Sequence, residues 1–119
     1  MNSKLSGRTI LIVDHEAERR SLLITSLQKD AFSNYAFLET ATGTDAIEFL
    51  ETVSVEAIFL AEQLSDFNAL DAIAAIRALP GCQTIPLLVL VKTETPATVM
   101  PLLEAGASFC FSVTQISPL

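Results

Sequence analysis

Asp14, His15 and Glu16 are three consecutive residues whose side chains bind cations or exchange protons, and they directly follow an apolar run. A carboxylate beside an imidazole is compatible with a metal ligand or a pH switch. A lone histidine without a cysteine or a second histidine is weak support for a metal, however. An aspartate at such a point also caps helices or accepts hydrogen bonds from backbone N–H groups. We expect these plainer roles: backbone or cap contacts for Asp14, and a surface or capping position for His15.

The apolar run that positions these residues covers residues 10–13 and consists of Ile, Leu, Ile and Val. A short continuous apolar run is typical of a strand that is buried on both faces, as in the middle of a parallel sheet. In open α/β sheets, ligands bind beyond the carboxyl ends of the strands. The polar residues therefore stand where the sequence predicts a site.

The rest of the chain alternates between apolar runs and segments with helical spacing. Three pairs of residues are helix start signals: Thr42 with Asp45, Asn68 with Asp71, and Thr95 with Pro96. Pro80, Gly81 and Gly106 are stop signals. The predicted strands cover residues 9–13, 35–38, 57–61, 87–91 and 108–113, and the predicted helices begin near residues 16, 42, 68 and 95. Strict alternation without a hairpin signal predicts a doubly wound α/β domain with helices on both faces of a parallel sheet.

Each predicted helix has one stripe of positions that should face the core. The stripes are Leu22, Leu23, Ser26 and Leu27; Ala46, Phe49, Leu50 and Val53; Ala69, Ala72, Ile73 and Ile76; and Val99, Leu102 and Leu103. Pro101 falls inside the last helix. It removes the hydrogen bond to the carbonyl of Ala97, and we expect it to kink or shorten that helix.

Composition excludes several classes of function. The 119 residues form one domain, and with 50% hydrophobic residues and a net charge of -7 the chain is a globular, acidic protein. Its few bases are scattered, so we expect no contact with nucleic acid. Arg19 and Arg20 are adjacent, and beside Glu16 and Glu18 we expect them to form a solvated helix face. No apolar stretch has the length of a membrane span.

Cys82 and Cys110 are too few for a disulfide framework, and neither belongs to a metal-binding motif. Cys110 lies in an apolar run and is expected to be a small buried hydrophobe. Together with the missing membrane span, this predicts a soluble, cytoplasmic domain with reduced thiols.

A set of motifs resembles the receiver (CheY-like) domain of two-component response regulators. The motifs are Ile-Val-Asp-His-Glu at residues 12–16, the strand at residues 57–61, Ile-Arg at residues 76–77, Pro86 before an apolar strand, and Glu-Ala-Gly-Ala at residues 104–107. The resemblance implies a flavodoxin-like sheet of five parallel strands in the order 2-1-3-4-5. It also implies a fifth helix, which is missing or truncated here. We expect residues 1–119 to be a single receiver-like domain and the N-terminal part of a longer protein.

In the resembling family, an aspartate at the end of the third strand is phosphorylated beside a magnesium ion. The corresponding positions here are Ala61 for the acceptor, His15 for one acid, Val91 for the sensing hydroxyl and Val113 for the lysine, while Asp14 keeps the first acid. A methyl group has no lone pair with which to attack phosphorus. Magnesium prefers oxygen ligands, so the resemblance implies a degenerate phosphorylation site without a metal or other cofactor.

The resulting hypothesis is a pseudo-receiver in a bacterial two-component or phosphorelay-type system. It would act without phosphorylation, by contact with a partner protein, an output domain or a second copy of itself. The expected interaction face, on the fourth helix and fifth strand, comprises Val99, Leu102, Leu103, Phe109 and Phe111. The alternative is a pseudo-receiver that senses a small molecule beside Asp14, Val91 and Val113. An enzyme is not expected, because the chain has no Gly-rich phosphate loop, nucleophile elbow or acid–base pair.

Overall fold

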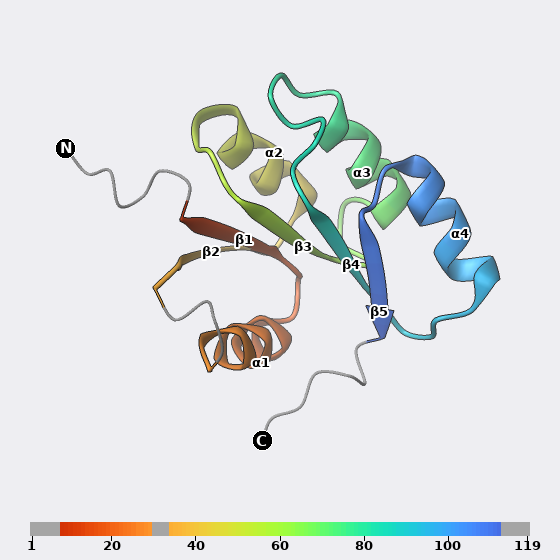
Figure 1. Cartoon of the computed structure of the whole chain (residues 1–119), viewed down its shortest axis with the longest axis horizontal. Coiled ribbons are helices and arrows are strands. Elements are labelled where there is room, and N and C mark those ends of the chain that lie inside the picture. Colours follow the sequence, from red (N-terminus) through yellow and green to blue (C-terminus); the bar gives the residue numbers. More distant parts are fainter. Residues whose placement is uncertain (1–7, 30–33, 113–119) are drawn as a thin grey trace.

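The computed structural model describes residues 8–29 and 34–112. Within them, five strands alternate with four helices (Figure 1). The strands are β1 (Thr9–Val13), β2 (Ala36–Thr40), β3 (Ala57–Ala61), β4 (Leu87–Val91) and β5 (Phe109–Ser112). The helices are α1 (Ala17–Gln28), α2 (Gly43–Thr52), α3 (Ala69–Arg77) and α4 (Pro96–Ala105). All neighbouring strands pair in parallel in the order β2-β1-β3-β4-β5, which confirms the predicted fold.

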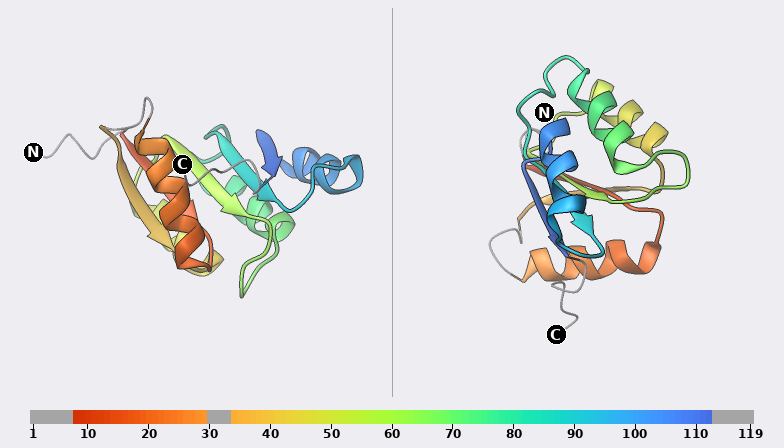
Figure 2. Two further views of the ribbon diagram at one scale, coloured as in Figure 1. Left: turned by 90° about the horizontal axis from the view of Figure 1, so that it is seen from below. Right: turned by 90° about the vertical axis from the view of Figure 1, so that its right-hand side faces the viewer.

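The sheet separates two apolar layers. Helices α2, α3 and α4 cover one face and α1 lies on the other (Figures 1 and 2). The larger core cluster lies under α2, α3 and α4, and a smaller one packs against Leu23 of α1. Strand β1 is buried along its whole length, as its apolar run predicts.

Three of the helices begin at the predicted caps. The side-chain oxygens of Thr42, Asn68 and Thr95 accept hydrogen bonds from backbone N–H groups at distances of 3.1, 2.9 and 3.3 Å, respectively. Each bond satisfies one of the N–H groups that a helix leaves unpaired at its start. The cap residue of α1 is Glu16, whose side chain makes no such bond.

Two of the predicted core positions are wrong. Leu22 is 40% exposed, because the buried stripe of α1 is centred on Leu23, with Ile24 and Leu27 packed beside it. Leu103 is 38% exposed, because α4 turns Leu102 into the core and packs Val99 and Ala105 against it. In α1 and α4 the buried stripe is centred on Leu23 and Leu102, and the adjacent Leu22 and Leu103, about 100° further around the helix, fall outside it.

The predicted stripe of α3 is correct throughout, since Ala69, Ala72, Ile73 and Ile76 are all buried. The predicted second strand, residues 35–38, begins one residue before β2 and ends two residues before it, since β2 covers Ala36–Thr40. The predicted start of the fifth strand, Ser108, precedes β5 by one residue, and its predicted end, Val113, lies outside the described residues.

Helix α4 continues through Pro101 for its full ten residues, so the proline does not end it. Gly106 ends it as predicted, with a φ of 126° that disfavours any residue with a Cβ.

Arg77 joins three segments around that turn. Its Nε and Nη2 donate to the carbonyl of Gly106 at 3.1 and 2.7 Å. Its Nη1 donates to the carbonyls of Cys82 and Ile85 at 3.0 and 2.7 Å. The guanidinium group of Arg77 therefore connects the ends of α3 and α4 to the segment that leads into β4.

Phe109 and Phe111 lie on the same face of the sheet as α1. Phe111 stacks on Phe109 and meets Phe59 edge to face, with ring centroids 6.2 and 6.3 Å apart. Helix α1 does not extend over β5 (Figure 2), and Phe109 is 56% exposed. Cys110 is buried as predicted, and burial raises the pKa of its thiol. None of the described helices is long and apolar enough to cross a membrane.

Candidate functional site

The carboxyl ends of β1, β3 and β4 meet at one edge of the sheet. Val13 pairs with Leu60, and Ala61 pairs with Leu90. Asp14, Glu62 and Lys92, which follow the last residues of these strands, therefore lie along the same edge. This is the edge at which the sequence predicts a site.

Asp14 is the buried acid of this edge, with a side chain that is 5% exposed. Its Oδ1 accepts from the backbone N–H of Glu16 at 2.9 Å and from Nη2 of Arg19 at 3.0 Å. Its Oδ2 accepts from Nε of Arg19 at 2.5 Å. The two-pronged pairing raises the pKa of Arg19 through the hydrogen bond to Asp14. Both carboxylate oxygens are thus engaged within the chain. The predicted contact with backbone donors is confirmed.

The expectation of a solvated face for Arg19 and Arg20 is wrong. Their side chains are 27% and 18% exposed. Arg20 donates from Nε to Glu39 at 2.9 Å and from Nη1 to the carbonyl of Asp14 at 2.6 Å. Helix α1 begins three residues after Asp14, which brings both guanidinium groups of its first turns back over the end of β1. The buried carboxylate of Asp14 then orients Arg19, while Glu39 and the backbone carbonyl of Asp14 orient Arg20.

His15 lies at the surface as predicted, with 42% of its side chain exposed. Its Nδ1 lies 3.9 Å from Asp14 and its Nε2 lies 3.9 Å from Glu16, beyond hydrogen-bond distance. Over residues 8–29 and 34–112, no three His, Cys, Asp or Glu side chains are grouped to hold a metal ion.

Ala61 and Val91 are buried in the core at the ends of β3 and β4, with exposures of 2% and 0%. They belong to the same packed cluster as Val13. Neither presents a polar atom beyond its backbone. Val113, the remaining predicted site residue, lies outside the described residues.

Two carboxylates hold the connection between β4 and α4. Oε1 of Glu62 accepts from the backbone N–H of Lys92 at 3.0 Å. Oε2 of Glu94 accepts from the backbone N–H of Ser112 at 2.7 Å, and Oγ of Ser112 donates to the carbonyl of Lys92 at 3.3 Å. The connection is therefore tied to the ends of both β3 and β5. Sequence reasoning missed these contacts, although acids directly after a predicted strand end are a usable signal.

The connection from β3 to α3 is held in a similar way. Oδ1 of Asp66 accepts from the backbone N–H of Gly43 at 2.9 Å, and Oδ2 accepts from the N–H and Oγ1 of Thr44 at 3.0 and 2.9 Å. These bonds, with that from Gly43 foremost, lower the pKa of Asp66. The ring of Phe67 packs directly on Gly43, where a Cβ would collide with it. Both loops at this edge are thus fixed by the chain's own carboxylates.

A cavity of about 540 Å³ opens beside the Asp14–Arg19 pair. The described residues that line it are His15, Glu16, Arg19, Glu62, Gln63, Leu90 and Lys92. Asp14, Ala61 and Val91 are not among them. The open space at this edge is therefore bounded mostly by charged side chains from α1 and the strand ends.

The family model described as the response regulator receiver domain matches residues 10–112, most of the chain. The chain belongs to this family. The receiver domain is similar to CheY4, a chemotaxis response regulator of Vibrio cholerae, with a TM-score of 0.83 and 18% identity over 95% of this chain and 91% of that one. A search of the curated proteins finds no match.

Two further solved structures share the fold. The receiver domain of the sensor histidine kinase PA1611 from Pseudomonas aeruginosa, with a magnesium ion in its active-site cleft, has a TM-score of 0.80 at 19% identity over 95% of this chain and 89% of that one. The phosphorylated cyanobacterial phytochrome response regulator RcpA has a TM-score of 0.78 at 15% identity over 93% and 86%. Receiver domains interact with kinases and output domains in response-regulator signalling.

The residues of this receiver domain do not fit a magnesium ion. Magnesium takes oxygen ligands in near-octahedral geometry. Both oxygens of Asp14 already accept hydrogen bonds from Arg19, whose positive charge also repels a second cation. His15 supplies nitrogen where a further carboxylate oxygen is needed. No step of a reaction is therefore assigned to a metal here.

Proposed function

We propose that this receiver domain signals from the cytoplasm through protein contact, without phosphorylation of an aspartate. Ala61 carries the proposal. It stands at the end of β3, at the position that corresponds to the phosphoacceptor, and its methyl group is no nucleophile. It is also 2% exposed, so no phosphodonor reaches it.

The Asp14–Arg19 pair supports the same conclusion by a separate route. Phosphoryl transfer depends on positive charge that neutralises the transferred group. Arg19, one of the cations at the strand ends, has both Nε and Nη2 occupied by Asp14. The charge of its guanidinium group is therefore already paired within the fold. The pair therefore holds the end of β1 and the start of α1 together without any ligand.

The contact face we propose is the one formed by α4 and β5. Leu103 is exposed on α4 and Phe109 is exposed on the α1 side of the edge strand β5, so the two residues flank that strand, whereas Leu102 is buried and holds α4 against the core. Val99 and Phe111 are partly buried beside the core clusters. Leu103 and Phe109 would therefore make the direct contacts with an output domain, a regulator or a second copy.

The test combines a chemical and a physical measurement on the same chain. Incubation with acetyl phosphate and magnesium, followed by intact-mass spectrometry, should show no phosphoryl group on the protein. Sedimentation velocity with and without the phosphodonor should give the same association state, for the chain alone and with its purified partner. A phosphoryl adduct, or association that depends on the phosphodonor, would contradict the proposal.

Matched variants distinguish a specific effect on the contact face from the general effect of replacing an exposed apolar residue. Phe109→Ser and Leu103→Ser should weaken association. Leu22→Ser changes an equally exposed leucine on α1, and should leave association unchanged. The small-molecule alternative is less well supported, because Ala61 and Val91 are buried and neither lines the cavity at the strand ends.

A further inference from the structure

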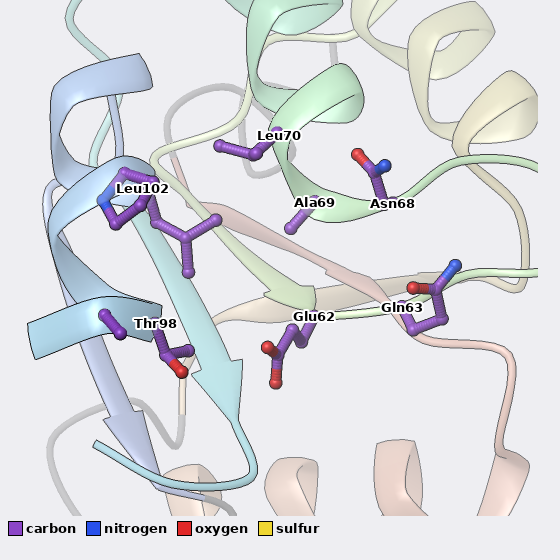
Figure 3. Close-up of a pocket in the computed structure, with 9 residues that line it drawn as sticks. Glu62, Gln63, Asn68, Ala69, Leu70, Thr98 and Leu102 are labelled. Atoms are coloured by element: carbon purple, nitrogen blue, oxygen red, sulfur yellow. The ribbon is translucent and has the colours of Figure 1, made fainter. Parts of the chain in front are cut away.

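A second hollow, of about 330 Å³, lies between the start of α3 and helix α4 (Figure 3). We call it the α3–α4 groove. Leu70 from α3 and Leu102 from α4 project toward each other across it, and Glu62 and Thr98 lie toward its other end (Figure 3). The described residues that line it are Glu62, Gln63, Asn68, Ala69, Leu70, Ala97, Thr98, Pro101 and Leu102.

The α3–α4 groove has apolar residues on one part of its wall and polar residues on the rest, and it is partly open to solvent. Leu70 is 42% exposed, and Ala97 and Pro101 are also exposed. Several of the α4 residues that line the groove have small side chains. Leu70 from α3 therefore does not fill the space between the two helices. Such a wall suits one apolar side chain of a partner, which would remove the exposed surface of Leu70 from water.

Hydrogen-bond acceptors accompany the apolar wall. Pro101 has no N–H, so the carbonyl of Ala97, four residues earlier, lacks its usual helical donor, and both residues line the groove. The carboxylate of Glu62 uses Oε1 for the N–H of Lys92 and keeps further acceptor capacity. An occupant with hydrogen-bond donors would therefore find acceptors in the lining of the groove.

The surrounding charge is negative. The two helices contribute Asp71 and Glu104 and one base, Arg77. Glu104 follows Ala97 by seven residues and Pro101 by three, so it lies on the same face of α4. The guanidinium of Arg77 is directed into three backbone carbonyls. Glu62 lies in the lining and Lys92, whose backbone N–H it binds, is a second base beside the groove. Acids still outnumber bases around the groove, so the field favours a cation.

We propose that the α3–α4 groove docks a cationic amphipathic segment of a partner protein. One apolar side chain of the segment packs between Leu70 and Pro101, and a neighbouring Lys or Arg donates to Glu62 and to the carbonyl of Ala97. This inference rests on the proposed function in that the domain acts by protein contact. It adds a second surface and specifies the chemistry of the partner.

The test is an amide NMR titration of the isotope-labelled chain with three synthetic helical peptides of equal length. One combines Leu on one face with Lys on the other, one replaces Lys with Glu, and one replaces Leu with Ser. The Leu/Lys peptide should produce saturable shifts at Leu70, Thr98 and Leu102. The Leu/Glu and Ser/Lys peptides should produce none, because each lacks one of the two required features.

Variants localise the binding. Glu62→Gln keeps the acceptor for Lys92 but removes the charge, and should weaken the Leu/Lys peptide by about tenfold, the loss expected for one charge-assisted hydrogen bond. Leu70→Ser should weaken it similarly. Glu48→Gln removes the same charge from an exposed position on α2 and should leave the affinity within about twofold.

Three results would overturn the inference: no saturable shifts, equal binding of the Leu/Glu peptide, or shifts centred on Phe109 and Phe111 instead of the groove. The titration contains no phosphodonor. Its failure therefore leaves the phosphorylation test of the proposed function unaffected, and a phosphoryl adduct in that test would leave the peptide result standing.

Discussion

Replacing Arg19 with Gln should destabilise the fold, because it leaves the carboxylate of Asp14 buried without its cation. The carboxylate of Asp14 would keep only the hydrogen bond from the N–H of Glu16. It would lose the two bonds from Nε and Nη2 of Arg19. A side chain that is 5% exposed cannot recover these bonds from water.

The size of the effect follows from the environment of each partner. Removing one partner of a fully buried ion pair costs about 3–5 kcal/mol. Arg19 is 27% exposed, so solvent already screens part of the interaction. We therefore expect a loss of about 2–3 kcal/mol in the free energy of unfolding for Arg19→Gln, below the fully buried range.

The assay is urea unfolding of a double-mutant cycle with Arg19→Gln, Asp14→Asn and the double variant at pH 7. The coupling energy between the two sites should be about 1–2 kcal/mol. Arg20→Gln is the matched control. It removes the ion pair with the more exposed Glu39 and the hydrogen bond to the carbonyl of Asp14, and should cost less than Arg19→Gln because it leaves no buried carboxylate without its cation. A coupling energy near zero, or a larger loss for Arg20→Gln than for Arg19→Gln, would refute the reasoning.

Three further changes have defined outcomes. Arg77→Met removes the hydrogen bonds to the carbonyls of Gly106, Cys82 and Ile85, and should lower the free energy of unfolding by about 2–3 kcal/mol in urea. Pro101→Ala restores the donor to the carbonyl of Ala97 and should raise the thermal midpoint through a gain of about 1 kcal/mol or more. Asp66→Asn should cost about 1 kcal/mol at pH 7. Because the folded-state pKa of Asp66 is lowered, this advantage of the wild type is complete above the unfolded pKa of about 3.9 and disappears as the pH falls through the folded-state value.

Two of these predictions have a control variant, and the third has an outcome that would contradict it. Gln83 donates to the carbonyl of Leu79, just beyond the end of α3 at which Arg77 lies. Gln83→Met therefore tests whether the loss of another polar group in this region has the same effect. Asp45→Asn changes an acid in the first turn of α2 that does not bond to Gly43, and should show a smaller pH dependence than Asp66→Asn. Unchanged stability in Pro101→Ala would mean that the proline imposes no cost on α4.

The order of the elements could be predicted because the apolar runs and helix caps are local signals. Thr42, Asn68 and Thr95 each act within their own first turn, so the sequence alone locates them. The stripe of α3 was likewise correct, since its period allows one buried face. The order of the strands came from the resemblance to a family, since alternation alone does not specify which strands are neighbours.

The contacts at the strand ends could not be predicted in the same way. The expected solvated face of Arg19 followed from its acidic neighbours in sequence, but the path of the chain after β1 brings it over Asp14. Arg77 binds carbonyls up to 29 residues away, a geometry that exists only after three elements have packed. The pairing of Glu94 with Ser112 likewise depends on where β5 ends relative to β4.

We propose that this receiver domain carries out neither phosphoryl nor metal chemistry. The most direct measurement is an amide NMR titration of the chain with magnesium and beryllofluoride, which mimics a phosphorylated aspartate. We expect no saturable shifts at Asp14, Ala61 and Val91. Saturable shifts at these residues would show that the strand ends still bind an anion–metal pair, and would contradict the claim.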